Sequence, residues 1–184
     1  MGFNDCLNSD IFVLMVDNFP KLLIENIPHL RRYARSLTRD RHQSEDLVQD
    51  CLDRALSRMS QWQSDTNLRA WLFTIMHNLH VSNLRSRYRG NEMESLDQSE
   101  IADMRQSGQE GMLQLRDLER AMSQLSDEQR EILMLVCVEG LRYEEVAQVL
   151  NVATGTVMSR LHRAREALRQ ILKGEEPTKL RRIK

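Results

Sequence analysis

The sequence predicts an all-α protein made of two small helical domains joined by a flexible acidic linker. Strong helix formers dominate its 184 positions, whereas glycine (7) and proline (3) are scarce and aromatic residues make up only 5%. Apolar residues recur at intervals of three and four over several long segments. No segment alternates between apolar and polar residues for long enough to indicate a strand.

The charge distribution divides the chain. Its formal net charge is only −1, but residues 91–119 hold eight acidic and two basic residues, and residues 154–184 hold nine basic and three acidic ones. A basic end of this kind suits contact with phosphates. Residues 91–111 also lack apolar periodicity, which is typical of a linker. We therefore expect a first domain over residues 1–90, a linker over 91–111 and a second domain over 112–184.

Cysteine usage and hydropathy indicate a cytoplasmic protein. The three cysteines form no CxxC pair, and Cys51 and Cys137 lie in apolar helical patterns, so we expect reduced thiols that act as small core residues. The apolar run Ile11–Val16 is too short to span a membrane, and no lysine or arginine precedes it as in a signal peptide. We expect no membrane insertion.

The first 59 residues are predicted to be mostly helical. Residues 28–39 have a clear helical period, with Pro28 in the first turn, and a weaker helix over residues 11–27 is expected to be interrupted at Pro20. The next helix spans about residues 45–59, with Ser44 as its N-cap.

A third, longer helix is predicted over residues 67–89. Its inner stripe includes Trp71, but Phe73 and His77 make the opposite side apolar as well. A helix that is apolar on both sides is either sandwiched between other elements or binds something on one side.

The second domain begins with a helix over residues 113–125. Ser126 and Gln129 have the spacing of a capping box for the next helix, over residues 127–139, which is expected to bury its apolar residues through Cys137. Gly140 is expected to end that helix.

Residues 142–172 have the pattern of a helix-turn-helix: a short helix over 143–150, a turn containing Asn151, and a second helix from about Gly155. An inner stripe from Val157 to Ile171 leaves a polar outer face. That face is an ordinary solvated surface in many terminal helices, but the short helix, turn and inner stripe together favour DNA recognition. The residues predicted to contact DNA from it are Thr156, Ser159, Arg160, His162, Arg163 and Arg165.

These residues match a known family. The stretch GLRYEEVAQVL at 140–150, followed by TGTVMSRLHRAREAL at 154–168, closely resembles region 4 of extracytoplasmic-function (ECF) sigma factors, which belong to the sigma-70 family. DLVQD at 46–50, and LRAWLFTI at 68–75 with Asn78, resemble region 2 of the same family. The amino-acid sequences at 34–38 and 67–73 resemble those of the general-stress branch of this family. The resemblance covers nearly all of residues 20–172.

The resemblance implies a protein that binds core RNA polymerase and initiates transcription of a stress- or signal-responsive regulon. Region 2 would dock on a clamp hairpin of the polymerase through Gln49, Asp50 and Asp53, which are otherwise an ordinary solvated helix face. Region 4 would engage the polymerase flap and the minus-35 promoter element. An anti-sigma factor is also an expected partner.

The resemblance also implies that the loop at 60–67 and the following helix meet the minus-10 element. Melting exposes bases that stack on aromatic side chains. The residues predicted to serve there are Trp62 and Phe73 for stacking, Asn78, Ser82 and Arg85 along the single strand, and Arg87 and Arg89 for phosphates. Met158 stands where many family members carry lysine or arginine.

Other classes of protein explain less of the sequence. A stand-alone helix-turn-helix regulator of transcription needs only residues 112–172, and a purely protein-binding adaptor needs no basic recognition face. An enzyme is not indicated, since there is no HExxH, phosphate loop or nucleophile motif. His77 and His80 are helical neighbours without an evident third ligand, so no metal or cofactor is expected.

Overall fold

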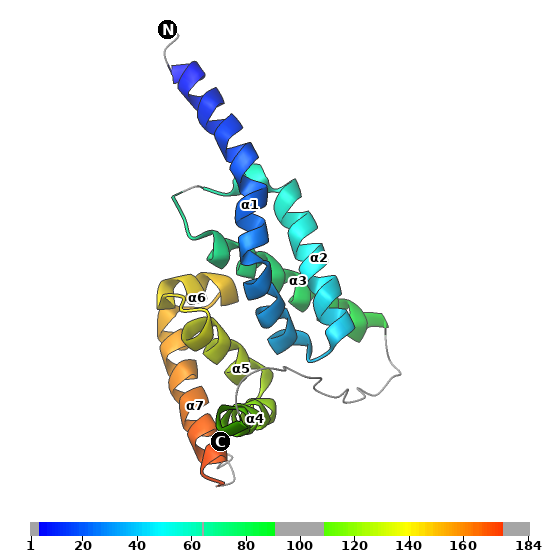
Figure 1. The fold of residues 1–184 in the computed structure, drawn as a ribbon, viewed down its shortest axis with the longest axis vertical. Coiled ribbons are helices and arrows are strands. Elements are labelled where there is room, and N and C mark those ends of the chain that lie inside the picture. The colour runs from blue at the N-terminus through cyan, green and yellow to red at the C-terminus, as the bar shows by residue number, and fades with distance from the viewer. Residues whose placement is uncertain (1–3, 64, 91–108, 175–184) are drawn as a thin grey trace.

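The computed structural model describes residues 4–63, 65–90 and 109–174, and within them the chain forms helices and no strand, which confirms the all-α prediction (Figure 1). The elements are α1 (Asn4–Thr38), α2 (Arg41–Ser57), η1 (Met59–Gln61), α3 (Leu68–Gly90), α4 (Gln109–Gln124), α5 (Asp127–Leu133), η2 (Met134–Val138), α6 (Tyr143–Leu150) and α7 (Thr154–Leu172). Most of the predicted linker lies outside the described residues, and the last three residues of that linker, 109–111, belong to α4.

Helix α1 runs through both of its prolines, so the predicted interruption at Pro20 is wrong. A proline removes one backbone donor from a helix and usually kinks or ends it. Here the helix has buried side chains on both sides of Pro20, namely Phe19 and Leu23, and again beyond Pro28, at Leu30. The free energy gained by burying this face against α2 and α3 outweighs the free-energy cost of a proline inside the helix.

The N-terminus of α2 is also capped differently from the prediction. Asp40, not Ser44, is the N-cap, and its carboxylate accepts a hydrogen bond of 2.7 Å from the backbone N–H of Gln43. Ser44 is instead buried inside the helix, where its hydroxyl donates to the carbonyl of Arg41. Both residues are good N-caps by type, and the helix begins one turn earlier than its apolar stripe suggests.

The helix predicted over residues 127–139 ends in a π-helical stretch, η2. The capping box of Ser126 and Gln129 at its start is confirmed. The wider turn of a π-helix rotates the following side chains relative to an α-helix. Cys137 is therefore exposed, against the prediction, while the carboxylate of Glu139 is fully buried.

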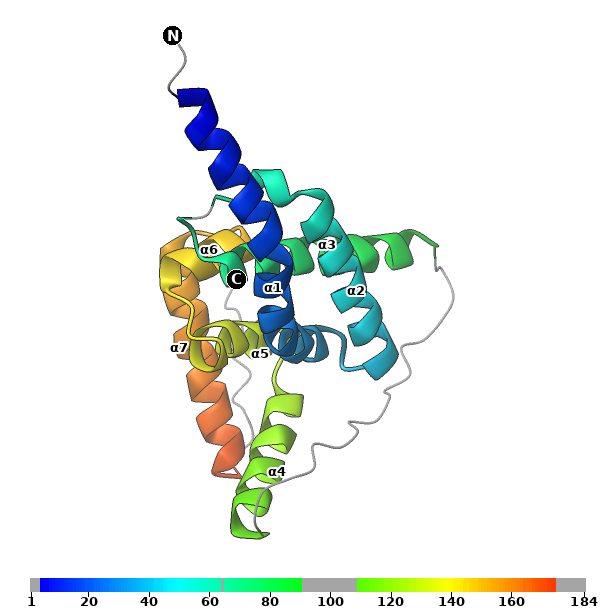
Figure 2. The ribbon, with the colours of Figure 1, turned by 45° about the horizontal axis from the view of Figure 1, so that its top comes forward.

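The two predicted domains share one continuous hydrophobic core. Helices α1, α2 and α3 pack together, as do α5, α6 and α7, and between these groups α5 contacts α1 and α6 contacts α3. Figure 2 shows α5 lying between α1 and α7. The buried residues of the two groups include Leu30, Cys51, Leu72 and Met76 in the first, and Ile132, Val146, Val157 and Leu161 in the second.

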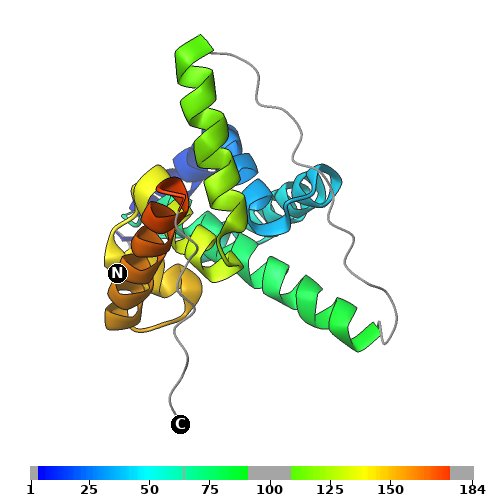
Figure 3. The same cartoon turned by 90° about the horizontal axis from the view of Figure 1, so that it is seen from below.

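Two helices project from this packed centre. Seen from below, the C-terminal half of α3 and the N-terminal half of α4 extend in different directions away from the other helices (Figure 3). The exposed side chains of α3 beyond Asn78 are therefore accessible along most of its outer turns.

Candidate nucleic-acid and polymerase interfaces

Helices α6 and α7 form the predicted helix-turn-helix. Asn151 ends α6 in the left-handed conformation, with φ 51°, and the next residue, Val152, donates a backbone hydrogen bond of 3.0 Å to Ala147. An asparagine tolerates this conformation better than most residues. Val157 and Leu161 are buried against the other helices, which fixes the face that α7 presents to solvent.

The outer face of α7 contains most of the residues predicted to read DNA. Ser159, His162 and Arg163 are exposed on its N-terminal half, as is Arg165. Thr156 is half-buried in the first turn.

Arg160 lies differently. Its side chain is partly buried and forms an ion pair of 3.7 Å with Glu128 of α5. A base contact by Arg160 would first have to break this pair, so the structure separates it from the other predicted residues.

A shallow cavity of about 300 Å³ lies beside this face, between α6 and α7. It is lined by Tyr143, Met158, Leu161, His162, Arg165, Glu166 and Arg169. Met158 is 50% exposed, so it presents a flexible apolar surface where many relatives are expected to carry a cation. Tyr143 was not predicted to belong to this surface. Its position at the start of α6, one residue after the cap, is the only sequence signal for it.

The residues predicted to meet the minus-10 element divide into two groups. Asn78, Ser82 and Arg85 are exposed and follow one another along α3, and Arg87 and Arg89 are exposed in its last turns. Arg87 donates a hydrogen bond of 2.8 Å to the side chain of Gln43 on α2. The outer part of α3 is therefore a polar and basic surface.

The two aromatic residues predicted to stack on bases lie in the core instead. Phe73 is fully buried, with its ring 4.8 Å from that of Tyr33, and Trp62 is only 9% exposed, with its ring 5.5 Å from that of Phe19. The indole N–H of Trp62 is buried without a hydrogen-bond partner. Neither ring therefore presents a free face on which a base could stack.

The residues predicted to bind polymerase occupy the outer face of α2. Gln49, Asp50 and Asp53 are all exposed. Cys51, between them in sequence, points the other way and is fully buried, as predicted. Burial, with the nearby charge of Asp50, raises the pKa of its thiol to about 12, so it stays protonated and unreactive.

The second apolar side of α3 is covered by the other domain. His77 is bonded through Nδ1 to the carboxylate of Glu131 on α5, at 2.8 Å. Burial lowers the pKa of the neighbouring His80, although the charge of Glu131 opposes this effect. In the described part of the chain no group of three histidine, cysteine or acidic side chains is placed to hold a metal ion.

The start of α6 is also tied to the first domain. The carboxylate of Glu145 accepts hydrogen bonds from the backbone N–H of Arg142, at 2.8 Å, and from the side chain of Asn67, at 2.9 Å. Burial alone would raise the pKa of Glu145, but these hydrogen bonds outweigh burial and lower it.

Among the described residues, no helix combines the length and the hydropathy that a membrane span requires.

Comparison with known proteins identifies the family. Residues 23–77 match the family model described as the Sigma2 domain of PhyR, and residues 115–168 match the model of Sigma-70, region 4. The chain is 38% identical over 159 residues to the ECF RNA polymerase sigma factor EcfG of Rhodopseudomonas palustris (strain TIE-1), across 86% of this chain and 87% of that protein. This chain belongs to the ECF family of RNA polymerase sigma factors.

Further relatives agree. The sigma factor is 36% identical over 156 residues to SigL of Mycobacterium tuberculosis (strain ATCC 25618 / H37Rv), across 80% of this chain and 85% of that protein. Among solved structures it is similar to the sigma factor RpoE crystallised in complex with the anti-sigma factor NepR from Bartonella quintana. That match has a TM-score of 0.71 and 36% identity, and it covers 85% of this chain and 97% of that one. The prediction of an ECF sigma factor is confirmed, and a stand-alone regulator is not favoured because both sigma regions are matched.

Proposed function

We propose that this sigma factor binds core RNA polymerase, recognises a minus-35 element with α7 and a minus-10 element with α3, and initiates transcription of a stress- or signal-responsive set of genes. The observation that carries the proposal is the joint presence, in one chain of the ECF family, of an exposed helix-turn-helix face and a separate polar, basic face on α3. Each face has the chemistry that its promoter element requires.

The minus-35 element is read by the N-terminal half of α7 in the major groove. Ser159, His162 and Arg163 supply donors for base edges and phosphates, and Arg163 has the fork that pairs with the two acceptors of guanine. Met158 and Tyr143 add apolar surface beside them, which suits contact with a thymine methyl group.

The minus-10 element is held by the outer surface of α3. Asn78, Ser82 and Arg85 are spaced one turn apart and line up as hydrogen-bond donors along a single strand, and Arg87 and Arg89 supply charge for phosphates. Because Phe73 and Trp62 are buried, neither of them offers a free ring to this surface. Extruded bases are held by polar contacts in this proposal.

Core polymerase is bound through the outer face of α2 and through region 4. Gln49, Asp50 and Asp53 form an exposed polar and acidic patch, which suits contact with a surface of complementary charge on the polymerase. The similarity to RpoE, which was crystallised with an anti-sigma factor, supports an anti-sigma partner for this chain as well.

The test is run-off transcription from a fragmented genomic library with purified core polymerase, with and without this protein. Discrete start sites that depend on the protein are expected, and their upstream sequences give both promoter elements. DNA binding without core binding or new start sites would contradict the proposal and indicate a simple regulator of transcription.

A further inference from the structure

Met158 is an exposed methionine on the helix that reads DNA in the proposed function. Its side chain is 50% exposed and lies in the second turn of α7. Among the methionines whose side chains the structure describes, no other is exposed: Met76 is fully buried, and the rest pack partly buried against the core, namely Met59, Met122 and Met134. A dissolved oxidant therefore reaches the thioether of Met158 before those of the others.

The surroundings of Met158 are rich in hydrogen-bond donors. Met158 lines the shallow cavity beside α7 together with side chains that can donate, namely Tyr143, His162 and Arg165. His162 lies one helical turn further along α7, and Arg165 donates to the sulfur of Cys137 at 3.7 Å. The cavity, of about 300 Å³, has room for one added oxygen atom. Its lining can therefore hydrogen-bond an oxygen atom that is attached to the sulfur of Met158.

Oxidation of a thioether by a peroxide is a two-electron oxygen transfer. The O–O bond of hydrogen peroxide breaks, and one oxygen atom forms a bond with the sulfur. The other oxygen takes up the proton of the transferred one and leaves as water. The sulfur loses two electrons and the peroxide gains them. A methionine sulfoxide reductase reverses the change with two thiols, which become a disulfide while the oxygen leaves as water.

The sulfoxide does not have the chemistry that the proposed DNA contact requires. The thioether is apolar and suits a thymine methyl group, whereas the sulfoxide is polar and adds a hydrogen-bond acceptor. Thymine methyl groups and phosphate oxygens offer that acceptor no donor, so burying it against DNA costs free energy. In the unbound protein the donors of the cavity satisfy the acceptor, which stabilises the free state further.

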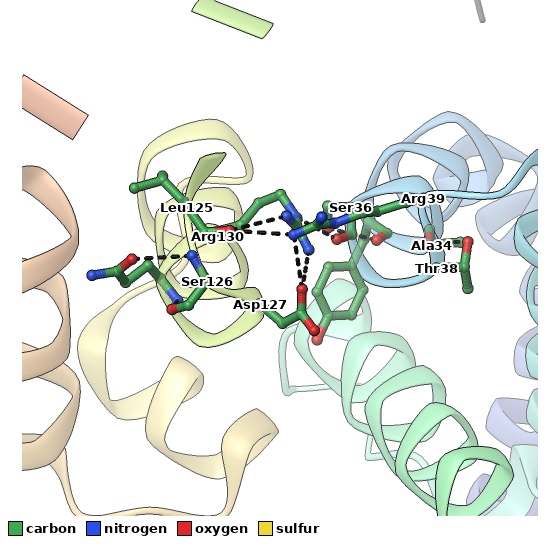
Figure 4. Close-up of polar contacts among 10 residues, drawn as sticks. Ala34, Ser36, Thr38, Arg39, Leu125, Ser126, Asp127 and Arg130 are labelled. Atoms are coloured by element: carbon green, nitrogen blue, oxygen red, sulfur yellow. Dashed lines mark hydrogen bonds and ion pairs between the residues drawn. The ribbon is translucent and has the colours of Figure 1, made fainter. Parts of the chain in front are cut away.

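The bonds that hold α5, the helix on which α7 packs, lie away from Met158. Arg130 of α5 donates to the carbonyl of Ser36 at 2.8 Å. Arg39 pairs with Asp127 at 3.0 Å, and Figure 4 shows both arginines between α5 and the end of α1. Oxidation of Met158 therefore changes the DNA-reading surface without removing a contact that maintains the fold.

We propose that Met158 is an oxidation site that regulates promoter binding: a peroxide converts its thioether to the sulfoxide, and region 4 then binds the minus-35 element more weakly until a sulfoxide reductase restores the thioether. The proposal rests on the proposed function, because a change on α7 alters promoter binding only if α7 reads a promoter element. The site of oxidation itself depends only on exposure.

Mass spectrometry of the full chain tests the site. The protein is treated with hydrogen peroxide, the reaction is stopped with catalase at a series of times, and the oxidised peptides are identified. Met158 is expected to gain one oxygen atom at least about three-fold faster than Met76 and Met122, because the oxidant must reach the sulfur. Equal rates at these methionines overturn the proposal.

Competition binding to a minus-35 fragment, by the full chain alone and with core polymerase, tests the consequence. After the peroxide is removed, dithiothreitol is added to reduce cysteine sulfenic acids and disulfides while the sulfoxide remains. The treated wild type is expected to bind at least about five-fold more weakly than the untreated protein, and to recover this loss with a sulfoxide reductase.

Three variants show which sulfur is responsible. Met158→Leu, compared with its own untreated form, is expected to lose no affinity on treatment. Met122→Leu is the matched control, since it removes a methionine that packs against the core, and it is expected to lose as much affinity as the wild type. Cys137→Ser removes the exposed thiol beside Arg165 and is expected to respond like the wild type.

A loss of affinity by treated Met158→Leu overturns the proposal. A treated Cys137→Ser that keeps its affinity does so as well, because the damage would then lie on the thiol. A wild type that is oxidised at Met158 and binds as before is equally contrary to it. If the untreated wild type binds no promoter DNA with or without core polymerase, the proposed function fails and the regulation fails with it, whereas mass spectrometry still decides the site of oxidation.

Discussion

Two exposed arginines on α7, Arg163 and Arg169, differ in whether a carboxylate pairs with their charge. Arg169, near the C-terminal end, forms an ion pair with Glu166 one turn earlier. Arg163, on the half of the helix that faces DNA in the proposed function, donates only to the backbone carbonyl of Ser159 among the bonds found in the described chain. Its charge is therefore not neutralised by a carboxylate, which suits a residue that binds an acceptor outside the protein.

Replacing Arg163 with alanine is expected to weaken binding to a minus-35 fragment by about 1–3 kcal/mol, because a bidentate contact to a base is lost. Competition binding with fragments that carry single base changes measures the loss and shows which position loses its preference. Arg169→Ala is the matched control. Equal binding by Arg163→Ala and the wild type would remove Arg163 from the reading face.

His80 makes the stability of the protein depend on pH. Burial, opposed by Glu131, places its pKa in the folded state below the ordinary value of 6.5. The neutral form is therefore favoured by folding, so the stabilisation is complete above about pH 6.5 and is lost as the pH falls through the lowered folded-state pKa.

Urea unfolding of the wild type and of His80→Gln at a series of pH values between 7.5 and about 5 checks this prediction. The difference in free energy of unfolding between the two proteins is expected to be constant above pH 6.5 and to move against the wild type below it. A difference that does not change with pH, or that moves in favour of the wild type in acid, contradicts the stated direction.

At the scale of elements, the turns that surround α6 require left-handed backbone at two positions. Gly140 precedes the helix with φ 69° and Asn151 ends it with φ 51°. Glycine adopts this conformation without strain, whereas a side chain raises its energy. A Cβ at position 140 would meet nothing within 4 Å, so only the backbone conformation opposes a larger residue there.

The two positions therefore respond oppositely to substitution. Asn151→Gly is expected to leave stability unchanged or raise it by up to about 1 kcal/mol, and Gly140→Ala to lower it by about 1–2 kcal/mol. Thermal and urea unfolding measure both. Stabilisation by Gly140→Ala would show that the left-handed conformation at this position is not required.

The π-helical stretch η2 decides which residues of its segment face inward. A regular α-helix over residues 127–139 would bury Cys137, as the apolar pattern indicates. The wider turn instead exposes Cys137 and turns Glu139 into the interface with α1 and α3. One irregular turn thus converts the end of an apolar helix into a buried polar contact between the two domains.

At the scale of the whole molecule, the surface proposed to bind polymerase lies on the outside of the first domain. Asp50 is exposed on the face of α2 that packs against neither α1 nor α3, so a change there leaves the cores intact. Asp50→Arg is expected to weaken binding to core polymerase by at least about ten-fold, because it reverses the charge at the centre of the proposed contact.

Co-purification with core polymerase and competition against the wild type measure this loss. Glu25→Arg on α1 is the control, since Glu25 is an exposed carboxylate of the same domain that lies outside α2. Equal binding by Asp50→Arg and the wild type would remove the outer face of α2 from the polymerase contact.

Much of the fold could be predicted because local patterns carry it. The helical period located α3, α6 and α7 to within a few residues, and the capping box at Ser126 and the turn at Asn151 were recognisable from residue type alone. The predictions that failed depend on distant contacts. Pro20 remains helical because Phe19 and Leu23 pack on other helices, and Phe73 is buried because α1 covers its side of α3.

The amino-acid sequence by itself determined the all-helical class, the helix-turn-helix and the membership of the ECF sigma factors, because periodicity, turn residues and motifs are properties of neighbouring positions. Only the tertiary structure decided that the second apolar side of α3 is sandwiched rather than free, and that Glu131 and Glu139 bind groups on α1 and α3. The physical reason is that burial and pairing of a charge depend on what lies opposite it in space. Residues separated by about a hundred positions in sequence supply that environment here.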